Sequence, residues 1–206
     1  MPIAIEPLAH HQLPLAAQAL SNAFQDDPLY NFVVPNPDHR RRWLPVIKKE
    51  VLRNTLPAGH TYIAIDDQRA ITAVMALTPP GKFPHPWWTN LRLFWNVLLW
   101  PTPWCPTVSK VWPLRRYAAT FDEIHYRQPH WYIDVIGVDA RWQGQGIGTL
   151  LMRRVIELSE ESQHPIWLET QTESNVGYYE AFGFRVTVKK HPAPGGPPTW
   201  GLLRPV

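Results

Sequence analysis

Apolar side chains recur at helical spacing in two N-terminal stretches of the chain. Between residues 13 and 24 they fall three or four positions apart, and the pattern ends near Pro28, because proline disfavours helical geometry in the residue before it. A second pattern of this kind begins after Pro37 and stops before Pro57. Both stretches are predicted to form amphipathic helices.

Strand-like patterns follow these helices. Residues 61–65 and 71–77 are rich in apolar and β-branched side chains and flank a polar turn, which predicts a hairpin. Residues 131–138 are almost continuously apolar, as expected for a central strand that is covered on both faces. Further strands are predicted at residues 166–170, 184–190 and 200–204.

Two more helices are predicted in the C-terminal half. The first follows the glycines near residue 146. Its apolar residues fall on one stripe, and its glutamates are predicted to face solvent; the stripe consists of Ile147, Leu150, Leu151, Val155 and Leu158. The second covers residues 175–182 and ends at Gly183, because glycine readily takes the left-handed conformation of a helix C-cap.

The middle of the chain has an unusual composition. Residues 79–113 hold eight of the 23 prolines and six of the 11 tryptophans. Helical spacing within residues 88–99 and 108–125 predicts an inserted helical pair, so that residues 1–206 form one domain with a helical insertion at 79–125. The insertion could pack on the sheet as a pocket wall, form the interface of a homodimer or rest on a membrane surface, and its few basic residues make the membrane the least favoured of these.

Charge and cysteine content narrow the classes of function. A net charge of +3 without a wide basic stripe does not favour nucleic acid, and the cluster Arg40 to Arg42 is predicted to be a solvated helix face. Cys105 is the only cysteine, which excludes an intramolecular disulfide and a zinc site built on cysteine pairs. No signal peptide is expected, and the apolar run Leu91–Trp100 is too short to span a membrane. We expect a cytoplasmic protein without a metal.

The most informative segment lies between residues 138 and 149. It places three glycines between a predicted buried strand and an amphipathic helix. A helix start exposes unpaired backbone N–H groups and the positive end of the helix dipole, and glycines let an anion approach the backbone closely. This segment is therefore predicted to bind a phosphate group.

Two other phosphate motifs fit the segment less well. A Walker loop requires a lysine after its last glycine, whereas Gly148 is followed directly by Thr149. A dinucleotide fingerprint would place its third glycine at Thr149, although Glu169 lies roughly where the ribose-binding acid could fall. Dinucleotide binding by a Rossmann-like unit stays an alternative.

Two motifs in order resemble the GNAT N-acetyltransferase superfamily. Gln143-x-x-Gly146-x-Gly148 after a strand looks like its acyl-CoA signature, and Asn175-x-x-x-Tyr179 leading to Gly183 looks like its later helix. The resemblance covers roughly residues 131–184. A weaker similarity points to the puromycin-acetyltransferase-like branch; it comprises Phe24 to Pro28, Pro79-Pro80-Gly81, His130-Trp131-Tyr132 and Pro198 to Pro205.

The resemblance implies a fold and a co-substrate. The fold is a mixed α/β one, with a mostly antiparallel sheet that splays between its fourth and fifth strands and is flanked by helices. Acetyl-CoA would lie in the opening, with its pantetheine arm along Ile136, Gly137 and Val138. The pyrophosphate would be held by Gln143, Gly144, Gln145, Gly146, Ile147, Gly148 and Thr149.

Catalytic roles also follow from the resemblance. Tyr179 matches the tyrosine that protonates the departing thiolate, although it could also be a packing aromatic like its neighbour Tyr178. Asn175 would contact the pantetheine arm or simply cap its helix. The implied activity is transfer of acetyl to a primary amine of a small molecule or peptide by direct attack in a ternary complex.

The attacking amine must be neutral, so a base is needed. Glu169 lies at the carboxyl end of a predicted central strand, and Asp134 interrupts an otherwise apolar strand. Each could be the base or a paired structural carboxylate. His125 and His130 have suitable chemistry but no spacing that requires them in the site.

Two choices stay open at the level of sequence. Asp26 and Asp27 could attract a cationic amine, or they could only end the first helix. A protein of this kind could also bind acyl-CoA as a sensor and transfer nothing.

Overall fold

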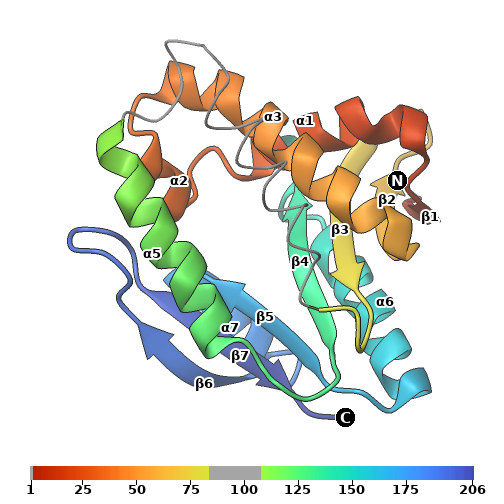
Figure 1. Ribbon diagram of the computed structural model, residues 1–206. Helices are drawn as coiled ribbons and strands as arrows, with labels where there is room; N and C mark the ends of the chain where they lie inside the picture. The colour runs from red at the N-terminus through yellow and green to blue at the C-terminus, as the bar shows by residue number, and fades with distance from the viewer. Residues whose placement is uncertain (1, 84–107) are drawn as a thin grey trace.

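A seven-stranded sheet runs through the computed structural model, which describes residues 2–83 and 108–206 (Figure 1). The strand order is β1-β2-β3-β4-β5-β7-β6, and every neighbouring pair is antiparallel except the parallel pair β4 and β5. The strands are β1 (Ala4–Pro7), β2 (Thr61–Ile65), β3 (Ile71–Thr78), β4 (Trp131–Val138), β5 (Ile166–Thr170), β6 (Arg185–Lys190) and β7 (Thr199–Arg204). The predicted mixed, mostly antiparallel sheet is confirmed.

The helices also follow the sequence pattern closely. They are α1 (Leu13–Ala23), α2 (Pro28–Val33), α3 (Pro37–Thr55), α5 (Val108–Ile124), α6 (Ile147–Ser162) and α7 (Glu173–Glu180). The short elements β1 and α2 were not predicted, because four and six residues carry too little periodicity to be recognised. The helix predicted at residues 88–99 and Cys105 lie outside the described residues. Among the described helices, none is long and apolar enough to cross a membrane.

Helices cover both faces of the sheet, because alternate residues of each strand point to opposite sides. On β2, Tyr62 and Ala64 belong to the apolar cluster that contains α6, whereas Ile63 and Ile65 belong to the cluster formed with α1. Helix α3 lies over α1, and α7 contacts β5 and β6 (Figure 1). Helices α1 and α6, which lie on opposite faces of the sheet, both contribute residues to the cavity of the candidate site.

The sheet opens between its fourth and fifth strands. Over their full described lengths, β4 and β5 pair only at Trp131 with Ile166 and at Tyr132 with Trp167. On its other edge β4 contains a bulge, because Ile133 pairs with Leu77 and Val135 with Ala76, which leaves Asp134 as the extra residue. Beyond Tyr132, one edge of β4 has no strand beside it.

Two side-chain placements differ from the sequence pattern. Leu150 is 37% exposed, and Met152 takes its place on the buried stripe of α6 because it projects closer to the centre of that stripe. Arg40 is buried rather than solvated, since its guanidinium donates to the carbonyls of Gln25 and Val34 at 2.6 and 2.7 Å. These bonds tie the ends of α1 and α2 to α3.

We expect Gly201→Ala to lower the free energy of unfolding by about 1–3 kcal/mol through overpacking. A Cβ at this position in β7 would lie 2.5 Å from the buried Trp167 ring and 2.8 Å from Val188. Gly177→Ala is the matched control, because nothing lies within 4 Å of its added Cβ in α7, and it should stabilise by roughly 0.5–1 kcal/mol. Urea unfolding measures both; equal stabilities of the two variants would contradict this packing.

Candidate functional site

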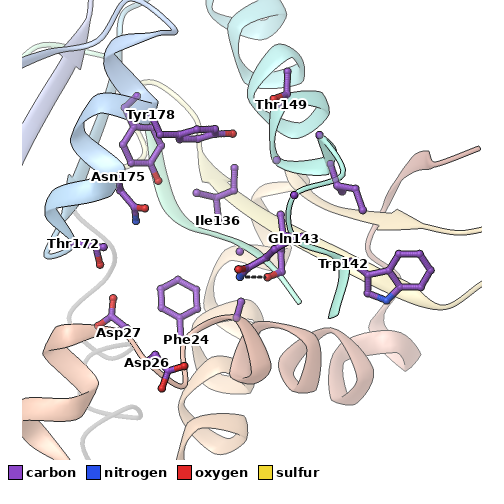
Figure 2. A pocket seen from close by; sticks show the side chains of 18 residues that line it. Phe24, Asp26, Asp27, Ile136, Trp142, Gln143, Thr149, Thr172, Asn175 and Tyr178 are labelled. Atoms are coloured by element: carbon purple, nitrogen blue, oxygen red, sulfur yellow. Dashed lines mark hydrogen bonds between the residues drawn. The ribbon is translucent and has the colours of Figure 1, made fainter. Parts of the chain in front are cut away.

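A cavity of about 560 Å³ lies where β4 separates from β5 (Figure 2). Its walls come from the end of α1 and the loop after it, the end of β4, the glycine turn, the start of α6, and α7. The lining residues are Ala23, Phe24, Asp26, Asp27, Ile136, Gly137, Val138, Trp142, Gln143, Gly144, Gly146, Ile147, Gly148, Thr149, Thr172, Asn175, Tyr178 and Tyr179. All predicted cofactor-binding residues except Gln145 are among them.

The glycine turn is held from behind by Asp139. Burial alone would raise the pKa of this carboxyl, but hydrogen bonds from Arg141 and Asn22 outweigh it and lower the pKa. The Asn22 amide donates to the carboxylate at 2.7 Å, and Arg141 donates through its backbone and side chain. The turn is thereby anchored to α1, which packs on one face of the sheet against β3 and β4.

Within the turn, two glycines have a backbone that other residues rarely adopt. Gly144 and Gly146 have φ of +77° and +78°, and Gly146 is the N-cap residue of α6. A glycine has no side chain to cap a helix, so the first N–H groups of α6 are left for another acceptor. Such groups suit an anion.

The two neighbouring tyrosines of α7 differ in environment. Tyr179 is 7% exposed and packs against Phe184, and burial raises the pKa of its phenol above the ordinary value. Tyr178 is 37% exposed and packs against the rings of Tyr179 and Phe182. Its hydroxyl lies 2.9 Å from the position of a Cβ on Gly148, so any larger residue there would have to displace the Tyr178 side chain. Both tyrosines line the cavity.

The two candidate bases are partnered and lie outside the described cavity lining. Glu169 accepts a 2.5 Å hydrogen bond from the Trp167 indole, and its carboxylate lies 3.5 Å from Nδ1 of His125. Asp134, the bulge residue, accepts from the Thr78 hydroxyl at 2.7 Å. His130 lies beside His125, and burial lowers its pKa. The structure brings Glu169 and the two histidines together, but separately from Tyr179.

Asp26 and Asp27 form the opposite end of the cavity from the glycine turn (Figure 2). Asp27 caps α2 by accepting from the backbone N–H groups of Leu29 and Tyr30 at 3.0 and 3.2 Å. Burial raises the pKa of Asp27, and hydrogen bonds, one of them from the Thr172 side chain, together with the charge of Lys48 oppose this shift. Asp27 is therefore both a helix cap and a cavity residue.

Lys48 is a residue that the sequence interpretation missed. Its side chain is 2% exposed, and its ammonium donates to the Tyr30 hydroxyl at 3.1 Å and lies 3.3 Å from the Phe24 ring centroid. Burial lowers the pKa of Lys48 to about 7, although Asp27 opposes the shift. A signal was present in the sequence: Lys48 lies midway between Leu44 and Leu52, at helical spacing on the buried stripe of α3.

No metal centre is visible in the described part of the chain. Among residues 2–83 and 108–206, no three His, Cys, Asp or Glu side chains come together in a way that could hold a metal ion.

Residues 107–184 match the model of the acetyltransferase (GNAT) family. This range includes β4, the glycine turn, α6, β5 and α7, and so contains most of the cavity walls. The match supports N-acetyltransferase activity, as the two sequence motifs had predicted. The finer assignment to the puromycin-acetyltransferase-like branch is not confirmed.

Several solved structures share the whole fold. A histone acetyltransferase HPA2 and related acetyltransferase from Corynebacterium glutamicum is 19% identical, with a TM-score of 0.72 over 100% of this chain and 97% of that chain. A Drosophila melanogaster polyamine N-acetyltransferase, which forms N-acetylagmatine, is 13% identical, with a TM-score of 0.66 over 100% of both chains. Arylalkylamine N-acetyltransferase 2 from Aedes aegypti is 12% identical, with a TM-score of 0.59 over 99% of both chains. At these identities the likeness shows the fold.

We expect Lys48→Met to change how stability depends on pH. The pKa of Lys48 falls from an ordinary 10.5 in the unfolded chain to about 7 in the folded protein, so between these values the unfolded state binds more protons. The Lys48 contribution to stability therefore rises with pH from about 7 to about 10, by on the order of a few kcal/mol.

The measurement is urea unfolding of both proteins across this pH range. Relative to the wild type, Lys48→Met should be most stable below pH 7, and its advantage should shrink toward pH 10, because only the wild type carries this titration. A stability difference that is independent of pH would show that Lys48 does not titrate in this way.

Proposed function

We propose that this chain, whose residues 107–184 match the GNAT family model, is an acetyl-CoA-dependent N-acetyltransferase. The observation that carries the proposal is the position of the matched segment: it forms the glycine turn and the splayed edge of β4, which face one cavity. A helix start with free N–H groups and an unpaired strand edge suit a long ligand with a pyrophosphate and amide groups.

The residues present fit acetyl-CoA, which would supply an acetyl group as a thioester to be converted into an amide with release of a thiol. Ile136, Gly137 and Val138 would hold the pantetheine arm through their backbone, with Asn175 across the cavity. The Val138 N–H would stabilise negative charge on the reacting carbonyl, an effect worth about 3 kcal/mol in other enzymes. The turn from Gln143 to Thr149 would hold the pyrophosphate.

Tyr179 would supply the proton to the departing sulfur. Burial raises the pKa of Tyr179, which keeps the phenol protonated before the reaction but makes it a weaker acid; the residue lines the same cavity as the edge of β4. Tyr178 would instead place its hydroxyl beside the start of α6, near Gly148 and Thr149.

The acceptor would be a primary amine, and we favour one that carries a positive charge. Asp26 and Asp27 line the end of the cavity opposite the glycine turn. The Drosophila enzyme that shares this fold forms N-acetylagmatine, a product of a cationic amine. The puromycin-acetyltransferase-like branch, the homodimer and the cytoplasmic location stay predictions from the sequence.

The proposal is tested by thiol release. The protein should bind acetyl-CoA and release coenzyme A when supplied with amines, including polyamines, antibiotics and peptides. Acetyl-CoA binding without acetylation of any amine in a broad panel would point to a sensor instead. Tighter binding of NAD than of coenzyme A would point to a dinucleotide-binding protein.

We expect Tyr179→Phe to lower kcat by roughly 10²-fold or more while the Kd for acetyl-CoA stays unchanged, because only the proton donor is lost. Tyr178→Phe is the matched control on the next residue of α7; it should weaken acetyl-CoA binding slightly and leave kcat nearly unaltered. Steady-state kinetics and calorimetry measure both. A kcat unaffected by Tyr179→Phe removes this residue as the acid.

The base is proposed to be Glu169 or Asp134, acting through water, since neither lines the described cavity. Replacing each carboxylate by the corresponding amide shows which of the two residues is the base. The working base should be the one whose amide variant, Glu169→Gln or Asp134→Asn, removes the low-pH limb of the kcat profile. If both variants keep that limb, the proton is taken by another group.

A further inference from the structure

A buried lysine lies directly behind the acceptor end of the cavity. The Lys48 side chain is 2% exposed, and among the described residues it donates one hydrogen bond, to the Tyr30 hydroxyl, although an ammonium has three N–H groups to donate. Burying such a group destabilises the fold unless it is paired well. A costly ionisable group of this kind beside a cavity is a candidate for a functional role.

Phe24 separates the lysine from the cavity. Lys48 Nζ lies 3.3 Å from the ring centroid, while Cε2 of the same ring lies 2.9 Å from the position of a Cβ on Gly137 in β4. The ring itself lines the cavity and is labelled in Figure 2. Lys48 thus lies behind this ring, where its charge can act on the cavity without touching a ligand.

We propose that Lys48 sets the charge of the acceptor end: its ammonium form offsets Asp27, and its neutral form leaves Asp27 free to attract a cationic acceptor. The identification of this end as the acceptor site rests on the proposed function. Lys48 would therefore be a specificity-determining residue that acts through the field at Asp27.

The charges around Lys48 support this assignment. Asp27 is the charged group whose interaction with Lys48 opposes the burial effect, and the same interaction opposes the raised pKa of Asp27. Tyr30 faces Lys48 from α2, and burial keeps its phenol protonated by raising its pKa. Helix α1 contributes no titratable side chain.

Other charged groups on the neighbouring helices are directed elsewhere. On α3, Arg40 donates to backbone carbonyls and Glu50 pairs with Arg53 at 2.6 Å. On the described part of α5, Arg115 and Arg116 are exposed. Asp26 also lines this end of the cavity, but Asp27 is the carboxyl whose charge interacts with Lys48, so the effect of Lys48 on this end is exerted through Asp27.

The titration of Lys48 near pH 7 should make the binding of a cation at this end depend on pH. Below that pH the ammonium repels a second cation and screens Asp27, and above it the repulsion disappears. A cation with a fixed charge should bind more tightly at about pH 8 than at about pH 6, by roughly five-fold. By linkage, binding of the cation near pH 7 must release protons from Lys48.

The experiment uses a trimethylalkylammonium ion, which keeps its charge at every pH and cannot be acetylated. Calorimetry of the full chain saturated with coenzyme A measures its Kd at both pH values, and repeated titrations in buffers of different ionisation enthalpy measure proton release. The wild type should bind more tightly at the higher pH and release protons near pH 7. Lys48→Met should bind tightly at both pH values and release none.

Two further variants complete the test. Lys49→Met removes the adjacent, half-buried lysine of α3 and should behave like the wild type. Asp27→Asn keeps a helix-capping side chain and should bind weakly at both pH values. No binding of the probe, or a pH dependence that persists in Lys48→Met, would overturn the proposal. Proton release in the wild type alone tests it if that variant does not fold.

These outcomes are separate from those that test the proposed function. Acetylation of no amine would overturn the transferase proposal, while the binding of the unreactive cation would still report on Lys48. Conversely, if the protein acetylates an amine but binds the cation equally well at both pH values, the transferase proposal stands and the proposed role of Lys48 is overturned.

Discussion

The loss of pairing between β4 and β5 is the constraint on which the site depends. The two strands pair at two positions, and after Tyr132 they diverge. The gap gives the end of β4 a free edge, and that edge leads directly into the glycine turn and the uncapped start of α6. An unpaired strand edge and a free helix start are both costly inside a fold unless something binds them, so one interruption in the sheet creates the elements of a ligand site together.

The acceptor side is built at an energetic cost. Helix α3 carries two buried cations that face the ends of α1 and α2. Arg40 donates to the carbonyls of Gln25 after α1 and Val34 after α2, and Lys48 lies under Phe24 beside Tyr30. Arg40 donates three hydrogen bonds to backbone carbonyls and so acts as a structural tie. Lys48 finds fewer partners, and burial brings its pKa close to neutral. The difference between them is the reason for assigning function to one and structure to the other.

Proton chemistry is divided between two places. Tyr179 lies on the cofactor side, where burial keeps its phenol protonated. Glu169 lies in a separate aromatic cluster with Trp167 and His125, and Asp134 is bonded to Thr78 in the bulge. A proton leaving an acceptor amine would have to cross from the cavity to reach either carboxylate, which favours transfer through water over direct contact.

Local pattern determined much of this molecule from the sequence alone. Strands β4 and β5 have the predicted bounds, and α1, α3 and α6 lie where apolar spacing placed them, because periodicity and glycine positions are properties of short segments. The glycine turn was recognised for the same reason. Other features depend on contacts between residues distant in sequence, and only the tertiary structure decided them. They are the burial of Arg40 and Lys48, the exposure of Tyr178, and the partners of Glu169 and Asp134. A charged side chain looks the same in sequence whether it faces water or an aromatic ring, and only the packing of separate elements settles which of these it meets.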